Sequence, residues 1–152
     1  MKDLQVFEGA NGLYGLKDEN EKVIVEPFAD IIAGDGRFKT NGKWGLLNLK
    51  TWKTILEPFA DEIYEDGRFE LNGKYGLLNF KTGKIIKEPF ADCIYLDGRF
   101  IANGKWGILN IETGKVIKEP FTDYIYYDGT FELNKKWGVL DLKTGKITKE
   151  AV

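Results

Sequence analysis

The sequence contains no histidine, one cysteine and no long apolar run. Without histidine, the commonest acid–base side chain at neutral pH and the commonest metal ligand are both missing, so we expect neither an enzyme nor a metal site. The single cysteine, Cys93, excludes an internal disulfide framework. No run approaches the roughly 20 apolar residues of a membrane helix, so no membrane partner is expected.

Charge and composition exclude further classes of protein. The net charge of -2 gives no basic surface for nucleic acid. With 43% hydrophobic and 30% charged residues, the 152-residue chain is typical of one globular domain. The N-terminal residues lack the apolar stretch of a secretory signal, which together with the lone cysteine predicts a cytoplasmic protein. A secreted protein after processing is the alternative. No cofactor-binding motif is present, and oligomeric state is not predicted.

What the sequence does contain is an internal repeat. The segment Asn41–Asn48 returns almost unchanged as Asn72–Asn79 and Asn103–Asn110, and more loosely from Asn11 and from Asn134. A period of about 31 residues predicts a repeat architecture, in which each unit buries its apolar surface against its neighbours.

The stretch Asp61–Phe90 illustrates one unit. Short alternating runs are separated by Asp66-Gly67 and Asn72-Gly73, which predict two-residue type I′ hairpin turns with positive φ at both central residues. A third turn places Gly83 in the left-handed position. Pro89 cannot donate to a ladder and therefore belongs on an edge strand or at a strand end. Each unit is predicted to be an antiparallel meander of about four strands.

The Trp-Gly strand is predicted to be an inner strand. Trp44 and Leu46 point to one face and Leu47 to the other, so both faces are apolar and each sheet should lie between two others. Gly45 would then allow a bulky neighbour to approach the backbone closely, with Phe59 as one candidate.

The unit count predicts a fold. Units begin at positions 11, 41, 72 and 103, and a fifth is split between 134–152 and 1–10. Complementary half-units at the two ends favour a ring closed by pairing terminal strands, whereas an open solenoid needs polar caps. We therefore predict one all-β domain over 1–152, a closed five-bladed propeller-like toroid. An open β-hairpin solenoid is the alternative.

These motifs carry a resemblance to a known family. Trp44-Gly45, Trp106-Gly107 and Trp137-Gly138, with Tyr14-Gly15 and Tyr75-Gly76 as aromatic substitutes, combine with a Thr-Gly-Lys turn and a Glu-Pro-Phe step. This combination resembles the bacterial WG-repeat family, also called KWG repeats, over essentially the whole chain. The resemblance implies β-rich interaction modules and brings no catalytic residues.

The repeated aromatic residues allow two interpretations. They could line pockets between units and stack on sugar rings, which is the basis of a lectin hypothesis. The favoured interpretation places them in the core between units, because an apolar residue follows each of them two positions later. The series is Tyr14, Trp44, Tyr75, Trp106 and Trp137.

Charged residues recur at the same period. The aspartates could form calcium sites, but we favour hydrogen bonding to backbone amides near turns. The arginines could bind anions, but we favour pairing with nearby acids; the lysines are predicted to form a solvated edge. The three series are Asp30, Asp61, Asp92 and Asp123; Arg37, Arg68 and Arg99; and Lys43, Lys74, Lys105 and Lys136.

Positions that break the repeat are the candidate partner contacts. Trp52 stands where other units have a turn glycine, so either the turn has changed type or Trp52 is an exposed anchor. Tyr124, Tyr127 and Ile101 replace polar or smaller residues and could form an apolar patch. We therefore predict a non-catalytic binding module for a protein or peptide partner, with a carbohydrate-binding lectin as the alternative.

Overall fold

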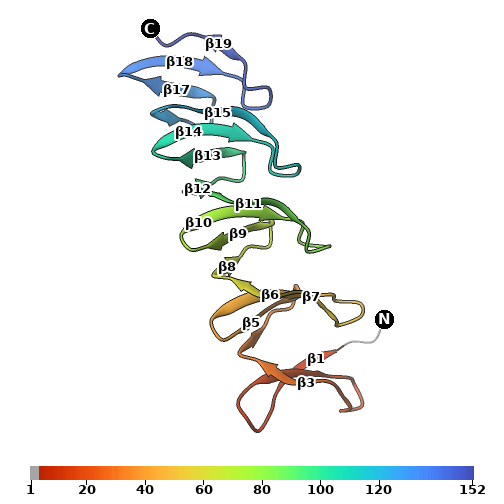
Figure 1. Cartoon of the computed structure of the whole chain (residues 1–152). Helices are drawn as coiled ribbons and strands as arrows, with labels where there is room; N and C mark the ends of the chain where they lie inside the picture. The colour runs from red at the N-terminus through yellow and green to blue at the C-terminus, as the bar shows by residue number, and fades with distance from the viewer. Residues whose placement is uncertain (1–3) are drawn as a thin grey trace. The chain divides into compact units, whose positions relative to one another are not determined.

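A computed structural model describes residues 4–152 of the chain. These residues contain no helix and form five small antiparallel sheets, each made of strands that are consecutive in the sequence (Figure 1). The prediction of an all-β protein is confirmed. The first sheet has three strands and the other four sheets have four strands each.

The strands recur in a fixed order. The first sheet comprises β1 (Gln5–Glu8), β2 (Tyr14–Lys17) and β3 (Val23–Ala29). The second comprises β4 (Ile31–Ile32), β5 (Arg37–Thr40), β6 (Lys43–Leu47) and β7 (Thr54–Ala60). The third comprises β8 (Glu62–Ile63), β9 (Arg68–Leu71), β10 (Lys74–Leu78) and β11 (Ile85–Ala91). The fourth comprises β12 (Cys93–Ile94), β13 (Arg99–Ala102), β14 (Lys105–Leu109) and β15 (Val116–Thr122). The fifth comprises β16 (Tyr124–Ile125), β17 (Thr130–Leu133), β18 (Lys136–Leu140) and β19 (Ile147–Lys149).

The turns explain how consecutive strands pair. Asn72 and Gly73 both have positive φ, 52° and 79°, so the predicted type I′ hairpin is confirmed. The Asp-Gly turn differs from its prediction, because only the glycine has positive φ. In the fourth sheet, Tyr95 N–H donates to Arg99 O, which encloses a three-residue loop whose last residue is the left-handed Gly98. This loop is a bulged hairpin turn rather than a two-residue turn.

The Trp-Gly strand is an inner strand, as predicted, and the strand that contains Glu-Pro-Phe is an edge strand. Opposite Gly107 this edge strand bulges, since Trp106 pairs with Thr122 but Ile108 pairs with Lys118. A Cβ on Gly107 would lie 2.6 Å from Lys118 O and 2.9 Å from Pro120 N. The expectation that this glycine allows a close approach is therefore correct. The approaching group is the bulged backbone together with the Phe100 ring, and not the phenylalanine of Glu-Pro-Phe.

The chain divides into two compact units. The first unit is Met1–Glu65 with Phe80–Gly83, and the second is Asp66–Asn79 with Lys84–Val152. In the first unit, Ala29 of β3 packs with Phe38 and Leu47 of the second sheet. Phe28 and Phe38 lie with ring centroids 5.2 Å apart, so a core lies between the first two sheets.

The second unit repeats this arrangement twice. Leu77 and Ala91 of the third sheet pack on a cluster that includes Phe100. Trp106 and Ile108 of β14 in turn pack on Ile125, Phe131 and Leu140 of the fifth sheet. The fourth sheet thus has both faces covered, as predicted for every sheet from its two apolar faces. The prediction is wrong for the fifth sheet, where Trp137 is 46% exposed.

Strand pairing also bears on ring closure. The expected closure required strands from the two ends of the chain to share one sheet. In the described residues, β18 pairs with β17 and β19, and β1 pairs only with β2. The fifth sheet is therefore completed by residues 124–133, and the toroid is not confirmed. Residues 1–3, which belong to the predicted split unit, lie outside the described part.

Candidate interaction surface

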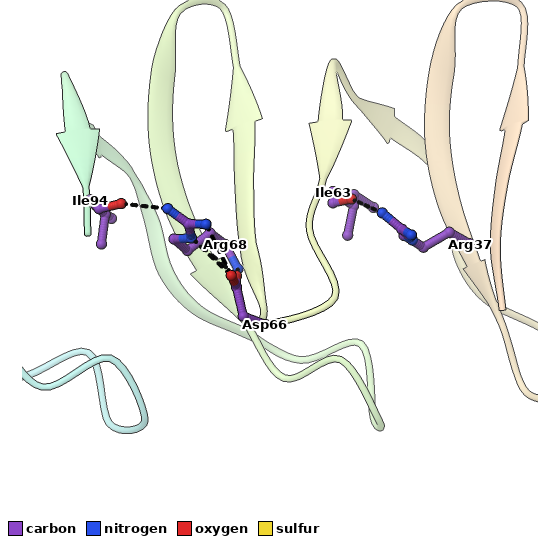
Figure 2. A network of polar contacts seen from close by, with 5 residues as sticks. All are labelled: Arg37, Ile63, Asp66, Arg68 and Ile94. Atoms are coloured by element: carbon purple, nitrogen blue, oxygen red, sulfur yellow. Dashed lines mark hydrogen bonds and ion pairs between the residues drawn. The ribbon is translucent and has the colours of Figure 1, made fainter. Parts of the chain in front are cut away.

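Arginine side chains connect successive sheets. Arg37 Nη1 donates to Ile63 O at 2.9 Å, and Arg68 Nη1 donates to Ile94 O at 2.8 Å (Figure 2). Arg99 donates in the same way to Ile125 O at 2.9 Å. Each arginine also pairs with the aspartate two residues before it, as the sequence predicted. The carbonyl contact was missed, because a backbone acceptor leaves no signal in residue type. These arginines are bound within the fold and are not an anion site.

The repeated lysines also bridge sheets. Three of the lysines at the start of a Trp-Gly strand pair with the aspartate that opens the next sheet, a contact the sequence did not predict, and they remain partly exposed to solvent as predicted. The pairs are Lys43 with Asp61, Lys74 with Asp92, and Lys105 with Asp123. The second oxygen of Asp123 accepts the Asn134 N–H at 2.9 Å, as the predicted turn role requires. Both partners are about 40–50% exposed, so each pair adds little stability.

These contacts set a pH dependence. The Lys105 ammonium and the Asn134 N–H lower the pKa of Asp123 below 3.8, and Lys74 does the same for Asp92. Because the folded-state pKa is depressed, the stabilisation is complete above the unfolded-state pKa and is lost as the pH falls through the folded value. We expect the free energy of unfolding to fall below about pH 4. Urea titrations of the wild type and Asp123→Asn should show a shallower acid slope for the variant; equal slopes would contradict this assignment.

Aromatic rings form a continuous series in the second unit. Tyr95 stacks on Trp106 with ring centroids 5.3 Å apart, and Tyr124 packs on the same indole at 4.3 Å. Tyr124 contacts Tyr126, which stacks on Trp137 at 5.4 Å. Arg99 lies 5.7 Å from the centre of the Trp106 ring. Trp106 is only 6% exposed, which leaves no room for a sugar on it.

The repeated aromatic residues are not equally covered. Tyr14, Trp44 and Tyr75 are half-buried, and Trp106 is buried. Trp137 is 46% exposed, and Val139, the equivalent of the fully buried Ile108, is 36% exposed. We use the term forward face for the side of a sheet that carries these residues and packs on the next sheet. The forward face of the fifth sheet is open in the structure.

The turn that contains Trp52 differs from the favoured prediction, which was that this turn had changed type. The φ of Trp52 is 61°, close to the 76° of Gly83, and its N–H donates to Asn48 O just as Gly114 N–H donates to Asn110 O. The turn has therefore kept its type, and the interpretation that it had changed is wrong. Trp52 is half-buried in the first unit. A left-handed tryptophan is strained by about 1–2 kcal/mol relative to glycine.

The other candidate contacts lie in the second unit. Tyr124 is 37% exposed, and it covers Trp106. Ile101 is half-buried and packs against the same cluster as Trp106, so its side chain supports the core. Tyr127 is 78% exposed on the loop between β16 and β17. Leu96 occupies the equivalent loop position one repeat earlier and is 57% exposed. The sequence did not single out Leu96 or the exposure of Trp137.

Hollows in the two units are shallow and are not repeats of one another. One of about 490 Å³ in the first unit is lined by Leu47, Leu49, Phe80 and Lys50, among others. One of about 320 Å³ in the second unit lies around Phe90, Asn103 and Glu119. Among residues 4–152, no three acidic or cysteine side chains gather as a metal site would require.

Comparisons of the chain with protein-family models, with curated proteins and with solved structures found no match. None of the described segments is a helix long and apolar enough to cross a membrane. The candidate surface is therefore defined by geometry alone. It consists of the open forward face of the fifth sheet and the exposed aromatic residue of its first loop.

Proposed function

We propose that this protein is a non-catalytic interaction module that binds a protein or peptide through its fifth sheet. The observation that carries the proposal is the contrast between Trp106, which is 6% exposed, and its repeat equivalent Trp137, which is 46% exposed. Exposed tryptophan and tyrosine side chains are enriched at the energetic centres of protein interfaces. Tyr127, at 78% exposure, adds a second aromatic residue to the same sheet.

The charged groups support a structural rather than a catalytic role. Asp92 and Asp123 have depressed pKa values because they accept hydrogen bonds from lysines and backbone amides within the fold. The Asp128 pKa is lowered by the Thr130 N–H in its own turn. These carboxylates stay ionised at neutral pH and are occupied by structural contacts, so they are poor general acids. The resemblance of the sequence to the WG-repeat family also supports an interaction module.

The choice between a closed toroid and an open solenoid also bears on the proposal. A closed toroid would cover the forward face of the fifth sheet, whereas an open β-hairpin solenoid leaves it free for a partner. Trp137 and Val139, 46% and 36% exposed, provide the apolar surface on which a partner could pack. The lectin alternative requires open aromatic faces in several repeats, and Trp106 offers none.

A displayed-peptide selection on the full chain tests this function. We expect peptides that bind saturably and lose affinity when Trp137 and Tyr127 are both replaced by alanine, while circular dichroism shows an unchanged fold. Calorimetry with a panel of sugars should give no heat of binding. Several equal weak sugar sites, or selected peptides that bind the double variant equally well, would overturn the proposal.

A further inference from the structure

The two interfaces between sheets in the second unit share a lysine–aspartate pair, an arginine–carbonyl hydrogen bond and a phenylalanine contact. The ring contact of Tyr124 belongs to the interface between the fourth and fifth sheets, because Cys93 stands at the equivalent position one repeat earlier. Between the fourth and fifth sheets, Lys105 pairs with Asp123, Tyr124 covers Trp106, and Ile125 is fully buried beside Ile108. These three contacts all come from one short segment, Asp123-Tyr124-Ile125. Arg99 makes a fourth contact with this segment by donating to the Ile125 carbonyl, and Phe121 packs on Phe131 outside it.

The forward face of the fifth sheet keeps some of the residues that make these interface contacts and lacks others. Lys136, Trp137 and Val139 stand where Lys105, Trp106 and Ile108 stand one repeat earlier. By contrast, Thr130 replaces the arginine, and Val152, 80% exposed, replaces the phenylalanine of Glu-Pro-Phe. The retained residues are those that contact the side chains of the Asp-x-Ile segment, whereas the arginine contact to its isoleucine carbonyl is lost. The phenylalanine contact, which is lost, holds the second strand of the next sheet, so the face fits a short segment better than a further complete sheet.

Charge on this face complements an acidic residue. Lys136 has no carboxylate partner among the described residues, whereas the equivalent lysines each have one. Lys135 stands beside it where the other hairpins have glycine, and it keeps a left-handed φ of 66°. Lys135 thus adds a second cation to the hairpin that leads into β18.

The geometry around Trp137 is prepared for a covering side chain. Tyr126 stacks on one side of the indole at 5.4 Å, just as Tyr95 stacks on Trp106. Trp106 is covered in addition by Tyr124, the residue that follows the aspartate, and Trp137 has no such second ring among the ring contacts described. An aromatic residue in a partner at this position would meet the open side of Trp137 in the same manner.

Resting on the proposed function, we propose that Lys136, Trp137 and Val139 bind a short extended peptide of a separate polypeptide, with the pattern Asp–aromatic–aliphatic. The aspartate binds the Lys135–Lys136 end of β18. The aromatic residue stacks on Trp137, and the aliphatic residue packs on Val139. The peptide therefore takes the place that Asp123-Tyr124-Ile125 holds on the fourth sheet.

The probe is a fluorophore-labelled, end-capped peptide with the sequence of residues 119–127, titrated into the full chain and followed by anisotropy. We expect saturable one-to-one binding that weakens about 30-fold with Trp137→Ala. A peptide with asparagine in place of the aspartate should bind about threefold more weakly, as should the wild-type peptide to Lys136→Ala, and both effects should shrink at high salt. A peptide of reversed sequence should not bind.

Leu96→Ala is the matched control, because it removes an exposed apolar side chain from the equivalent loop of the fourth sheet, and it should leave the affinity unchanged. Loss of binding with Tyr127→Ala but not with Trp137→Ala would overturn this inference and still support the proposed function. Absence of any binding by this peptide, when the displayed library yields other ligands, would also overturn only the inference. Sedimentation of the chain alone gives a further check. Concentration-dependent association abolished by Trp137→Ala would identify a second copy as the occupant and overturn the inference.

Discussion

Replacing Trp106 by alanine is expected to lower the free energy of unfolding by about 3–5 kcal/mol. The indole is 6% exposed and is enclosed by Tyr95, Tyr124 and the Arg99 side chain, so its removal leaves a cavity between the fourth and fifth sheets. Urea unfolding followed by far-ultraviolet circular dichroism measures the change.

Trp137→Ala is the matched control for that prediction. The two tryptophans occupy the same repeat position, but Trp137 is 46% exposed and packs on one ring only, Tyr126, among the ring contacts described. We expect its replacement to cost about 1 kcal/mol, because little apolar area is returned to water. Equal losses for the two variants would show that the forward face of the fifth sheet is covered in solution.

Gly107→Val should have the second large effect, a loss of about 3 kcal/mol. A Cβ at this position would lie 2.6 Å from the Lys118 carbonyl oxygen and 2.9 Å from the Phe100 ring. The bulged edge strand cannot move away without breaking its pairing with β14, so the steric clash cannot be relieved at a low energetic cost. Thermal and urea unfolding of the variant measure this cost.

Gly34→Val provides the control for this substitution. No heavy atom lies within 4 Å of a Cβ at position 34, and its φ is not left-handed. Equivalent loop positions in later repeats already carry Glu65, Leu96 and Tyr127. We expect a change within about 0.5 kcal/mol. A similar loss for both variants would mean that the close approach at Gly107 is not the cause.

Local features of the fold were predictable because each depends on a few neighbouring residues. The Asn72-Gly73 turn, the inner position of the Trp-Gly strand and the edge position of Pro89 follow from backbone preferences and from alternation along a strand. The Asp66-Gly67 turn was predicted with the wrong length, because Asp-Gly suits both a two-residue turn and the end of a bulged three-residue loop.

Features that depend on contacts with the next repeat were harder to predict from the sequence. The arginine contact to a carbonyl and the lysine–aspartate pair both join residues whose separation in the sequence carries no signal until the stacking of sheets is known. Ring closure was inferred from half-units whose boundaries were arbitrary, and placing each boundary before the first hairpin removes the half-unit at the C-terminal end. Trp137 was grouped with its equivalents because sequence shows residue type and not coverage.

Hydrogen exchange of the tryptophan indole N–H groups, followed by nuclear magnetic resonance on the ¹⁵N-labelled chain, tests the central claim most directly. That claim is that, in the second unit, the fifth sheet covers the forward face of the fourth sheet and that the forward face of the fifth sheet has no such cover. We predict slow exchange for Trp106 and exchange close to that of an unprotected indole for Trp137. Equal protection of Trp106 and Trp137 would contradict the account.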